Sequence, residues 1–247
     1  MAPPKRKGSN SPQSLEQALL DSISGCKENV DRVCIGIHWT AVKSRNVGMA
    51  HTYKTARKVE IEGSGELEGM SAASVARRLL SWEPLEASLG TAALNSLLEP
   101  VGEKGSVNDL IMEKARGKTV TVIGRFPFNA DVKRAAKKAY LLEMEPEKGE
   151  LPSHASERVI PESELSVISA TALINHSLQR LLELASNSYT VVLGPSTPMS
   201  KALFGYGVDV LAGVRVTDPE ALFRSLSQGA KSFNSIRGIE PVCLFAD

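Results

Sequence analysis

The strongest chemical signal in the sequence is a pair of hydroxyl residues that follows an apolar run. Ser196 and Thr197 come shortly after Gly194, and Pro198 follows them at the expected start of a short helix. Hydroxyl groups and backbone N–H groups at the positive end of a helix favour binding of an anion. Residues 194–198 therefore predict a site for a phosphate or a carboxylate.

Two charged residues follow other apolar runs. Glu143 ends the run 139–143, and Arg125 comes after Gly124 at the end of the run 119–123. An acidic residue at the end of the second strand of a nucleotide-binding sheet accepts hydrogen bonds from ribose hydroxyls, although the same carboxylate can bind an amine or a metal. Arg125 can hold an anionic group by a bidentate contact, or it can be a solvent-exposed charge. The loop lacks the G-x-G-x-x-G pattern, which argues against a dinucleotide pyrophosphate cradle.

Asn175 and Glu86 each have a structural and a functional interpretation. Asn175 follows small hydroxyl residues after the run 165–169, so it either caps the next helix or contacts a ligand. Glu86 lies near the start of the expected helix 85–98, where a carboxylate also stabilises the helix dipole.

The sequence contains no familiar catalytic motif. Patterns of the G-x-S-x-G, H-E-x-x-H and P-loop kinds are absent, and the four histidines lack the spacing of metal ligands. A soft metal site at Cys34, His38 and His51 requires a hairpin register that brings the three together. The sequence therefore names neither a catalytic residue nor a metal ligand.

The elements that must position these residues alternate in the C-terminal half. Short apolar strands alternate with helices there, which is the signature of a parallel, Rossmann-like sheet. The expected strands are residues 119–123, 139–143, 165–169, 189–193 and 208–216, and the expected helices are residues 131–138, 175–185 and 218–228, with a short one from Pro198.

The N-terminal half has a different order of elements. A helix capped by Ser14 precedes a strand over residues 30–43, which turns and returns over 47–53. Three helices follow, over residues 72–80, 85–98 and 107–115. The order predicts an α+β domain, and the whole chain is therefore of the α/β class. We expect a disordered tail at residues 1–12, a first domain at 13–116 and a second at 117–247.

Composition limits the classes of partner. The chain has 247 residues and a formal net charge of +1, with 42% hydrophobic, 23% charged and 5% aromatic residues. Such a balance favours neither nucleic acid nor a membrane surface as a partner. Three widely spaced cysteines indicate no disulfide framework, and no apolar run approaches the length of a membrane span. We expect a cytoplasmic protein and, from the base rate alone, a homodimer.

Several motifs together carry a family resemblance. They are Trp82 with residues 86–90 and 92–95, residues 122–127, Leu142 and Glu143 with Pro146, Gly149 and Pro152, and residues 192–198. In this order they resemble the heavy-metal chelation domain family DUF364 with a DUF4213 domain before it, over nearly the whole chain. The resemblance implies a first domain like the N-terminal domain of enolase, a Rossmann-like second domain and an active site in the cleft between them.

The resemblance also implies a set of ligand-binding residues. They are Glu86, Asn95, Gly124, Arg125, Pro127, Glu143, Asn175, Gly194, Ser196 and Thr197. Where relatives can carry histidine after the first-loop glycine, this chain has Arg125, which is a poor metal ligand.

Three functions are open at this point. The first is binding or processing of a small anionic metabolite, or of its heavy-metal chelate, in the cleft between the domains. The second is an enzyme, a transferase or a lyase, whose nucleotide-like cosubstrate is held by Glu143. The third is a scaffold without catalysis. A transition metal and a nucleotide-like ligand are accordingly the two cofactors to look for.

Overall fold

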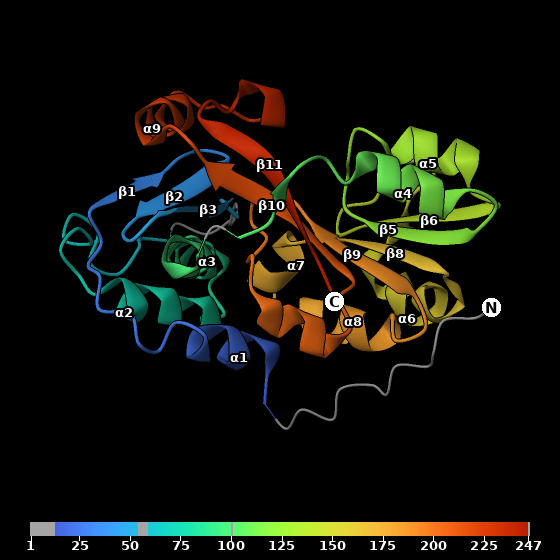
Figure 1. Ribbon diagram of the computed structural model, residues 1–247, viewed down its shortest axis with the longest axis horizontal. Helices are drawn as coiled ribbons and strands as arrows, with labels where there is room; N and C mark the ends of the chain where they lie inside the picture. The colour runs from blue at the N-terminus through green and yellow to red at the C-terminus, as the bar shows by residue number, and fades with distance from the viewer. Residues whose placement is uncertain (1–12, 54–58, 100, 247) are drawn as a thin grey trace.

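The computed structural model describes residues 13–53, 59–99 and 101–246, which contain a small sheet packed on a buried helix and a larger sheet beside them (Figure 1). A three-stranded antiparallel sheet with its helices forms the N-terminal part, and an eight-stranded mixed sheet forms most of the rest. The α/β class predicted from the sequence is confirmed. The tail expected at residues 1–12 lies outside the described residues.

The small sheet has the order β1-β2-β3. Its strands are β1 (Arg32–Ile35), β2 (Trp39–Lys43) and β3 (Val47–His51). The prediction of one strand over residues 30–43 is wrong, because the chain reverses at Gly36 and β1 pairs antiparallel with β2. The N–H of Gly36 donates to the carbonyl of Trp39 at 3.0 Å, and a Cβ at Gly36 would lie 2.8 Å from the carbonyl oxygen of Leu226. Glycine therefore allows both the tight turn and a close neighbour.

Alternate residues of the small sheet face two different helices. Ala41 and Met49 pack against α9 (Pro219–Ser227), whereas Val42 packs in the core around α3 (Pro84–Leu97). This follows from the two-residue period of a strand. The small sheet is therefore covered on both faces.

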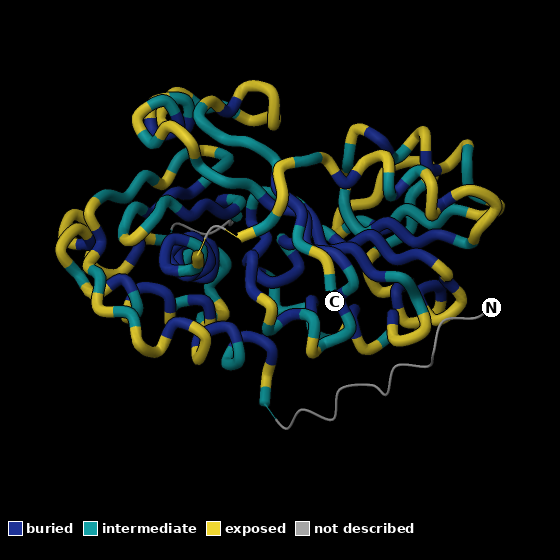
Figure 2. The backbone as a smooth tube through the Cα atoms, in the orientation of Figure 1, coloured by how far each residue is buried: buried dark blue, intermediate teal, exposed yellow. Residues whose placement is uncertain are grey.

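Helix α3 is buried on nearly all sides (Figure 2). Every residue from 87 to 94 is buried, and most of these side chains are small. The hydroxyls of Ser88, Thr91 and Ser96 donate to carbonyls of the same helix at 2.7–2.8 Å. Because these bonds satisfy the polar groups locally, the helix can be enclosed without unpaired hydroxyls.

The other N-terminal helices begin where the sequence predicts. Ser14 caps α1 (Leu15–Asp21), and Ser71 caps α2 (Ala72–Ala76), which continues into the 3-10 helix η1 (Arg77–Leu80). Both α2 and η1 pack against α3.

The large sheet has the order β4-β11-β10-β9-β8-β5-β6-β7. The neighbours from β10 to β7 are parallel, whereas β11 is antiparallel to both β10 and β4. The strands are β4 (Glu103–Lys104), β5 (Thr119–Ile123), β6 (Lys138–Glu143), β7 (Leu151–Pro152), β8 (Leu165–Ser169), β9 (Tyr189–Leu193), β10 (Val210–Val216) and β11 (Ile239–Phe245). The predicted parallel strands are confirmed, and the sequence does not predict β4, β7 or β11.

Helices cover both faces of the large sheet (Figure 1). On one face lie α4 (Asn108–Ala115) and α5 (Asn129–Ala135), and on the other lie α6 (Ser156–Val159), α7 (Thr171–Ile174) and α8 (Leu178–Leu184). Four 3-10 helices complete the order: η2 (Ser153–Ala155), η3 (Ile160–Glu162), η4 (Lys201–Tyr206) and η5 (Phe233–Ser235). Within the described ranges, no helix combines the length and the apolar character needed to cross a membrane.

The two halves exchange elements. The predicted boundary at residue 116 directly follows α4, whose buried residues pack with those of β5 and β8 in the large sheet. Conversely, α9 leaves the C-terminal half and covers the small sheet, as Figure 1 shows. This interlocking holds β3 and α3 against the carboxyl ends of the parallel strands.

Candidate functional site

The order of the parallel strands indicates where a ligand should bind. Apart from the two-residue edge strand β7, the parallel strands along the chain are β5, β6, β8, β9 and β10, counted here as first to fifth, and β5 lies between β6 and β8. In sheets with this order, ligands bind outside the carboxyl ends of the strands, where the first strand meets the third. That place is the junction of β5 and β8, with β6 beside it.

Gly124 lets the loops after β5 and β8 come close together. Its φ is +115°, and a Cβ there would lie 2.9 Å from the Cβ of Ser169. The hydroxyls of Ser169 and Thr171 are 2.8 Å apart on the β8 side. Glycine is therefore required, and the junction is lined by hydroxyl groups.

Glu143 lies at the end of β6, next to this junction. The side chain is half-buried, and burial raises the pKa of its carboxyl above the ordinary 4.5. The charge of Arg125 and the backbone N–H groups of Met144 and Arg125 act in the opposite direction. Groups with perturbed pKa values concentrate at functional sites, which makes Glu143 a candidate.

The raised pKa of Glu143 predicts a dependence of stability on pH. A carboxyl with a raised folded-state pKa supports folding while it is protonated, and this support is lost as the pH rises through the folded-state pKa. At pH 7 we expect Glu143→Gln to raise the free energy of unfolding, by less than about 1 kcal/mol because the group is partly solvated. Below pH 4 the difference from the wild type should disappear.

Urea unfolding at pH 7 and at pH 3.5 measures this difference. Glu145→Gln is the matched control, because Glu145 is an exposed carboxylate of the same segment. If Glu143→Gln stabilises the protein equally at both pH values, the assignment is contradicted.

Tyr53 reaches the same junction from the N-terminal part, directly after β3 and Thr52. Its backbone N–H donates to Ser88 Oγ at 3.1 Å, and its hydroxyl accepts from Asn175 Nδ2 at 3.1 Å. Burial raises the pKa of the phenol; the Asn175 hydrogen bond lowers it, and the charge of Glu143 raises it again. We call Tyr53, Glu143 and Asn175 the switch cluster. The sequence does not predict Tyr53.

Asn175 lies between α7 and α8, so the predicted helix over residues 175–185 is wrong at its start. Its Oδ1 accepts from the N–H and the hydroxyl of Ser177 at 3.1 and 2.6 Å, which orders the turn before α8. The same contact directs Nδ2 toward Tyr53. The oxygen of the Asn175 amide therefore has the structural role expected of a cap, whereas its nitrogen faces the other residues of the switch cluster.

Arg125 is engaged by the segment that follows β6. Its guanidinium contacts both carboxylate oxygens of Glu150 at 3.0 and 2.7 Å, and it lies 3.4 Å from a carboxylate oxygen of Glu147. The hydrogen bonds to Glu150 raise the pKa of Arg125 above its ordinary range. Pro127, in the same loop, is exposed. Arg125 thus joins the loops after β5 and β6, and its charge is balanced within them.

Ser196 and Asn95 join the two parts of the molecule. Ser196 Oγ accepts from the backbone N–H of His51 at 2.9 Å. Asn95 Nδ2 donates to the carbonyls of Met49 and Ser196, each at 3.1 Å. These residues form a hydrogen-bonded bridge from α3 and β3 to the loop after β9.

Thr197 is equally engaged, and the helix expected at Pro198 does not form there. Thr197 Oγ1 donates to the carbonyls of Gly194 and Ala212 at 2.7 and 3.1 Å. Gly194 has a φ of +120°, and the next helix, η4, begins only at Lys201. The helix terminus on which the anion prediction for residues 194–198 relied is therefore absent from this loop, and the two hydroxyls form hydrogen bonds within the protein.

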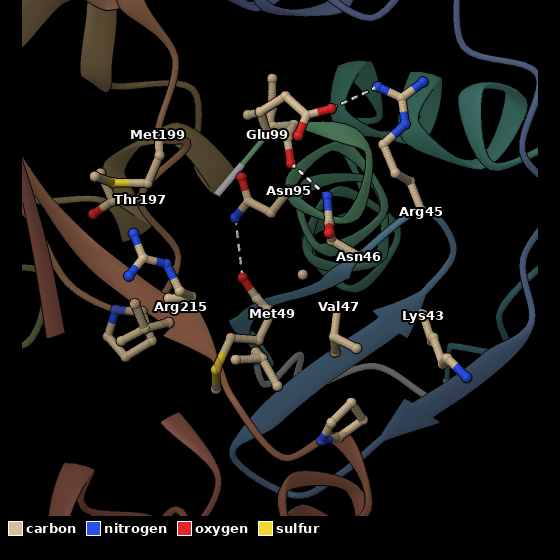
Figure 3. A pocket seen from close by; sticks show the side chains of 16 residues that line it. Lys43, Arg45, Asn46, Val47, Met49, Asn95, Glu99, Thr197, Met199 and Arg215 are labelled. Atoms are coloured by element: carbon tan, nitrogen blue, oxygen red, sulfur yellow. Dashed lines mark hydrogen bonds and ion pairs between the residues drawn. The ribbon is translucent and has the colours of Figure 1, made fainter. Parts of the chain in front are cut away.

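A cavity of about 250 Å³ lies beside the bridge (Figure 3). It is bounded by β3, the end of α3, the loop after β9, and β10, and both Asn95 and Thr197 line it. Within the described residues, Asn95 Oδ1 is buried without a hydrogen-bond partner.

Three cations also line this cavity: Lys43, Arg45 and Arg215. Arg45 forms ion pairs with Glu28 and Glu99, and Arg215 forms one with Glu240. Figure 3 shows Arg45 and Lys43 at the side away from Arg215.

Glu86 belongs to a separate ion pair. Its carboxylate accepts from Arg78 at 2.9 Å and from the backbone N–H of Glu62 at 2.8 Å, and both charged side chains are largely buried. Arg78 also donates to the carbonyl of Glu62 at 2.9 Å. The contacts of Glu86 in the described residues therefore hold the segment before α2 against α3.

The donors for a metal are dispersed. The described ranges contain no group of three or more His, Cys, Asp or Glu side chains that could hold an ion. Cys34 pairs with Ala41 and His51 with Trp39, so the hairpin register does not assemble the soft site considered above. In the remaining positions the sequence has only Asp247 of these residue types. Direct chelation of a heavy metal does not fit this donor set.

Comparisons with known proteins agree with the fold. A family model described as "Putative heavy-metal chelation", DUF364, matches residues 106–241, and DUF4213, with the same description, matches residues 17–98. The crystal structure of a protein with unknown function from the DUF364 family of Desulfitobacterium hafniense DCB-2 is 25% identical, with a TM-score of 0.83 over 94% of this chain and 98% of that chain. A DUF364 protein with unknown function from Pyrococcus horikoshii is 20% identical, with a TM-score of 0.80 over 94% and 100%. No curated protein matches the chain.

Proposed function

The chain belongs to the DUF364 family, with a DUF4213 domain before it, and on this premise we propose that it binds a small metabolite of nucleoside type at the switch cluster. The observation that carries the proposal is the place of Glu143. It ends the second parallel strand, beside the junction of the first and third, and follows Gly124 by 19 residues. In dinucleotide-binding sheets an acidic residue about 20 positions after the first loop accepts from ribose hydroxyls, and Glu143 has the corresponding position in this sheet.

The surroundings of Glu143 favour a nucleoside over a dinucleotide. The loop after β5 reads Gly-Arg-Phe-Pro and lacks the further glycines of a pyrophosphate cradle. Arg125, the cation of this loop, is already paired with Glu150 and Glu147. A ligand that offers hydroxyl donors to Glu143 needs no additional positive charge, whereas a pyrophosphate does.

Titration calorimetry with adenosine tests the proposal. We expect saturable binding to the wild type and an affinity at least about tenfold lower for Glu143→Gln, because a hydrogen bond to a charged group contributes about 1.5–3 kcal/mol. Glu145→Gln should bind as the wild type does. With 2′,3′-dideoxyadenosine, which lacks both hydroxyls, we expect weak binding to all three proteins.

Equal affinity of adenosine for the wild type and for Glu143→Gln would show that Glu143 does not contact the ligand. Absence of any adenosine binding to the wild type would overturn the nucleoside proposal as a whole.

A small anionic metabolite, or its heavy-metal chelate, is the second candidate ligand, and a different observation favours it. The described lining of the cavity beside the bridge has three cations, Lys43, Arg45 and Arg215, and one carboxylate, Glu99. Arg45 and Arg215 also pair with Glu28 and Glu240, which lie outside the lining. Because the chain's own donors do not form a metal site, a metal ion would arrive there as part of such a chelate. The same calorimetry with citrate, free and as its Cd²⁺ complex, tests this candidate, and absence of heat in both titrations would contradict it.

A further inference from the structure

Two hydrogen-bond donors of the switch cluster point at the sulfur atom of Met144. The hydroxyl of Tyr53 donates to Met144 Sδ at 3.4 Å, and Asn175 Nδ2 lies 3.5 Å from the same atom. A thioether is among the weakest acceptors in a protein. The sulfur therefore occupies a position where an oxygen acceptor would bind much better.

The two donors are fixed, whereas the acceptor is not. Tyr53 is held by its backbone contact with Ser88, and Asn175 is held by both contacts with Ser177. Met144 is 59% exposed and its side chain is unbranched, so its sulfur can move away from the two donors and back.

We propose that Met144 is a reversible oxidation site, and that the sulfoxide oxygen formed there locks onto the Tyr53 and Asn175 donors. The oxidant is a hydroperoxide. The sulfur attacks the terminal oxygen of the peroxide, an S–O bond forms as the O–O bond breaks, and the proton ends on the departing oxygen as an alcohol or water. Sulfur is oxidised by two electrons and the peroxide is reduced by two.

The product fits the existing donors better than the thioether does. The sulfoxide oxygen is a strong acceptor, and it can lie between the two donors once the exposed side chain moves outward by a short distance. Before oxidation the Tyr53 hydroxyl and the Asn175 amide share a weak acceptor, the thioether sulfur. After oxidation they share a strong acceptor, the sulfoxide oxygen.

Exposure makes the modification selective. Among the described methionines, Met144 is 59% exposed, Met70 and Met112 are intermediate, and Met49 and Met199 are buried, at 1% and 8%. Oxidation of a buried methionine also places a polar group in the core. Oxidation of the exposed Met144 does not. Methionine sulfoxide reductases reverse the modification, so the exposed site can cycle.

The consequence for ligand binding rests on the proposed function. A sulfoxide bound to Tyr53 and Asn175 would occupy two of the three residues of the switch cluster, so we expect oxidation to close the cluster to a nucleoside. The modification itself does not depend on that ligand.

The experiment uses the full chain, graded hydrogen peroxide and peptide mass spectrometry. We expect the sulfoxide of Met144 to form at least about tenfold faster than those of Met49 and Met199. In protein with ¹³C-labelled tyrosine, the Cζ resonance of Tyr53, assigned with Tyr53→Phe, should shift on oxidation at neutral pH and return after treatment with a sulfoxide reductase.

Met144→Leu is the matched control, because leucine keeps the size of the side chain and removes the sulfur. Peroxide should leave the Tyr53 resonance of this variant unchanged. The proposal is overturned if Met144 is oxidised no faster than the buried methionines, or if its sulfoxide forms without moving the Tyr53 resonance.

The two proposals fail separately. Neither oxidation measurement uses a ligand, so a missing response to adenosine bears on the proposed function alone. If adenosine binds, the oxidised wild type should bind it at least about tenfold more weakly, while peroxide leaves its binding to Met144→Leu unchanged.

Discussion

Gly90→Ala is expected to lower the free energy of unfolding by about 3 kcal/mol or more. A Cβ at this position would overlap the backbone of Arg78 and Leu79 in η1, which packs directly on α3. Overpacking costs about 1–3 kcal/mol where side chains can yield, and here the obstacle is backbone. Since small domains have only about 5–15 kcal/mol of stability, a single methyl group should remove a large part of it.

Urea unfolding of Gly90→Ala and of a control measures this cost. Gly25→Ala is the control, because nothing lies within 4 Å of a Cβ added at Gly25. We expect the control to be neutral or slightly stabilised, since alanine restricts the unfolded chain. If Gly90→Ala unfolds at the same urea concentration as Gly25→Ala, then η1 and α3 do not approach as closely as described.

Gly48 has the corresponding role on the other side of α3. A Cβ there would overlap the backbone of α3 at Ala92 and Ser96. Helix α3 is thus packed backbone to backbone against both η1 and β3, and this close packing sets the distance between Ser88 and Tyr53 on one side and Asn95 and Met49 on the other. The position of the switch cluster depends on these two glycines.

The sequence predicts the parallel strands well because their signal is local. Residues 119–123, 165–169 and 189–193 are apolar runs bounded by turn residues, and β5, β8 and β9 have these bounds. Buried parallel strands read as continuous apolar runs, so little else competes with this interpretation. The antiparallel strand β11 is missed, because Pro241 interrupts its pattern and only its pairing with β10 and β4 identifies it.

Apolar content alone does not locate a reversal of the chain. Residues 30–43 are apolar enough for one long strand, and the break is marked only by Gly36, whose N–H closes the turn onto the carbonyl of Trp39. The helix expected at Pro198 is wrong for a similar reason. Proline suits a first helical turn, but Thr197 bonds to Gly194 and to Ala212 of β10, and the next helix begins only at Lys201.

The candidate site is predictable only in part, because its partners are distant in sequence. Glu143 and Asn175 are found from their places after strands. Tyr53 is not, since the residue that it contacts, Asn175, lies 122 positions away. The sequence also does not show whether a polar side chain is already bonded within the protein. Ser196 accepts from His51, 145 positions away, and Arg125 is paired with Glu150.

Arg78→Met is expected to cost about 3 kcal/mol of unfolding free energy, because it leaves the carboxylate of Glu86 without its ion pair in a largely buried place. The side chains of Arg78 and Glu86 are 15% and 14% exposed. Removing one partner of a buried pair costs about 3–5 kcal/mol, whereas replacing both by apolar residues is often neutral. The double variant Arg78→Met, Glu86→Leu should therefore recover most of the loss.

Urea unfolding of Arg78→Met and of the double variant, with Arg180→Met as the control, measures these changes in the free energy of unfolding. Arg180 and Glu157 form a solvent-exposed pair, 57% and 55% exposed, so their loss should cost less than about 1 kcal/mol. If Arg78→Met proves no less stable than the control Arg180→Met, the assignment of a buried pair is wrong.

The same double variant decides what Glu86 does. The family resemblance places Glu86 among the ligand-binding residues, whereas its contacts with Arg78 and Glu62 account for its carboxylate structurally. We expect the folded double variant to bind adenosine with the affinity of the wild type. A double variant that is stable but does not bind adenosine would show that Glu86 contributes to ligand binding, and the binding site would then extend to the first turn of α3.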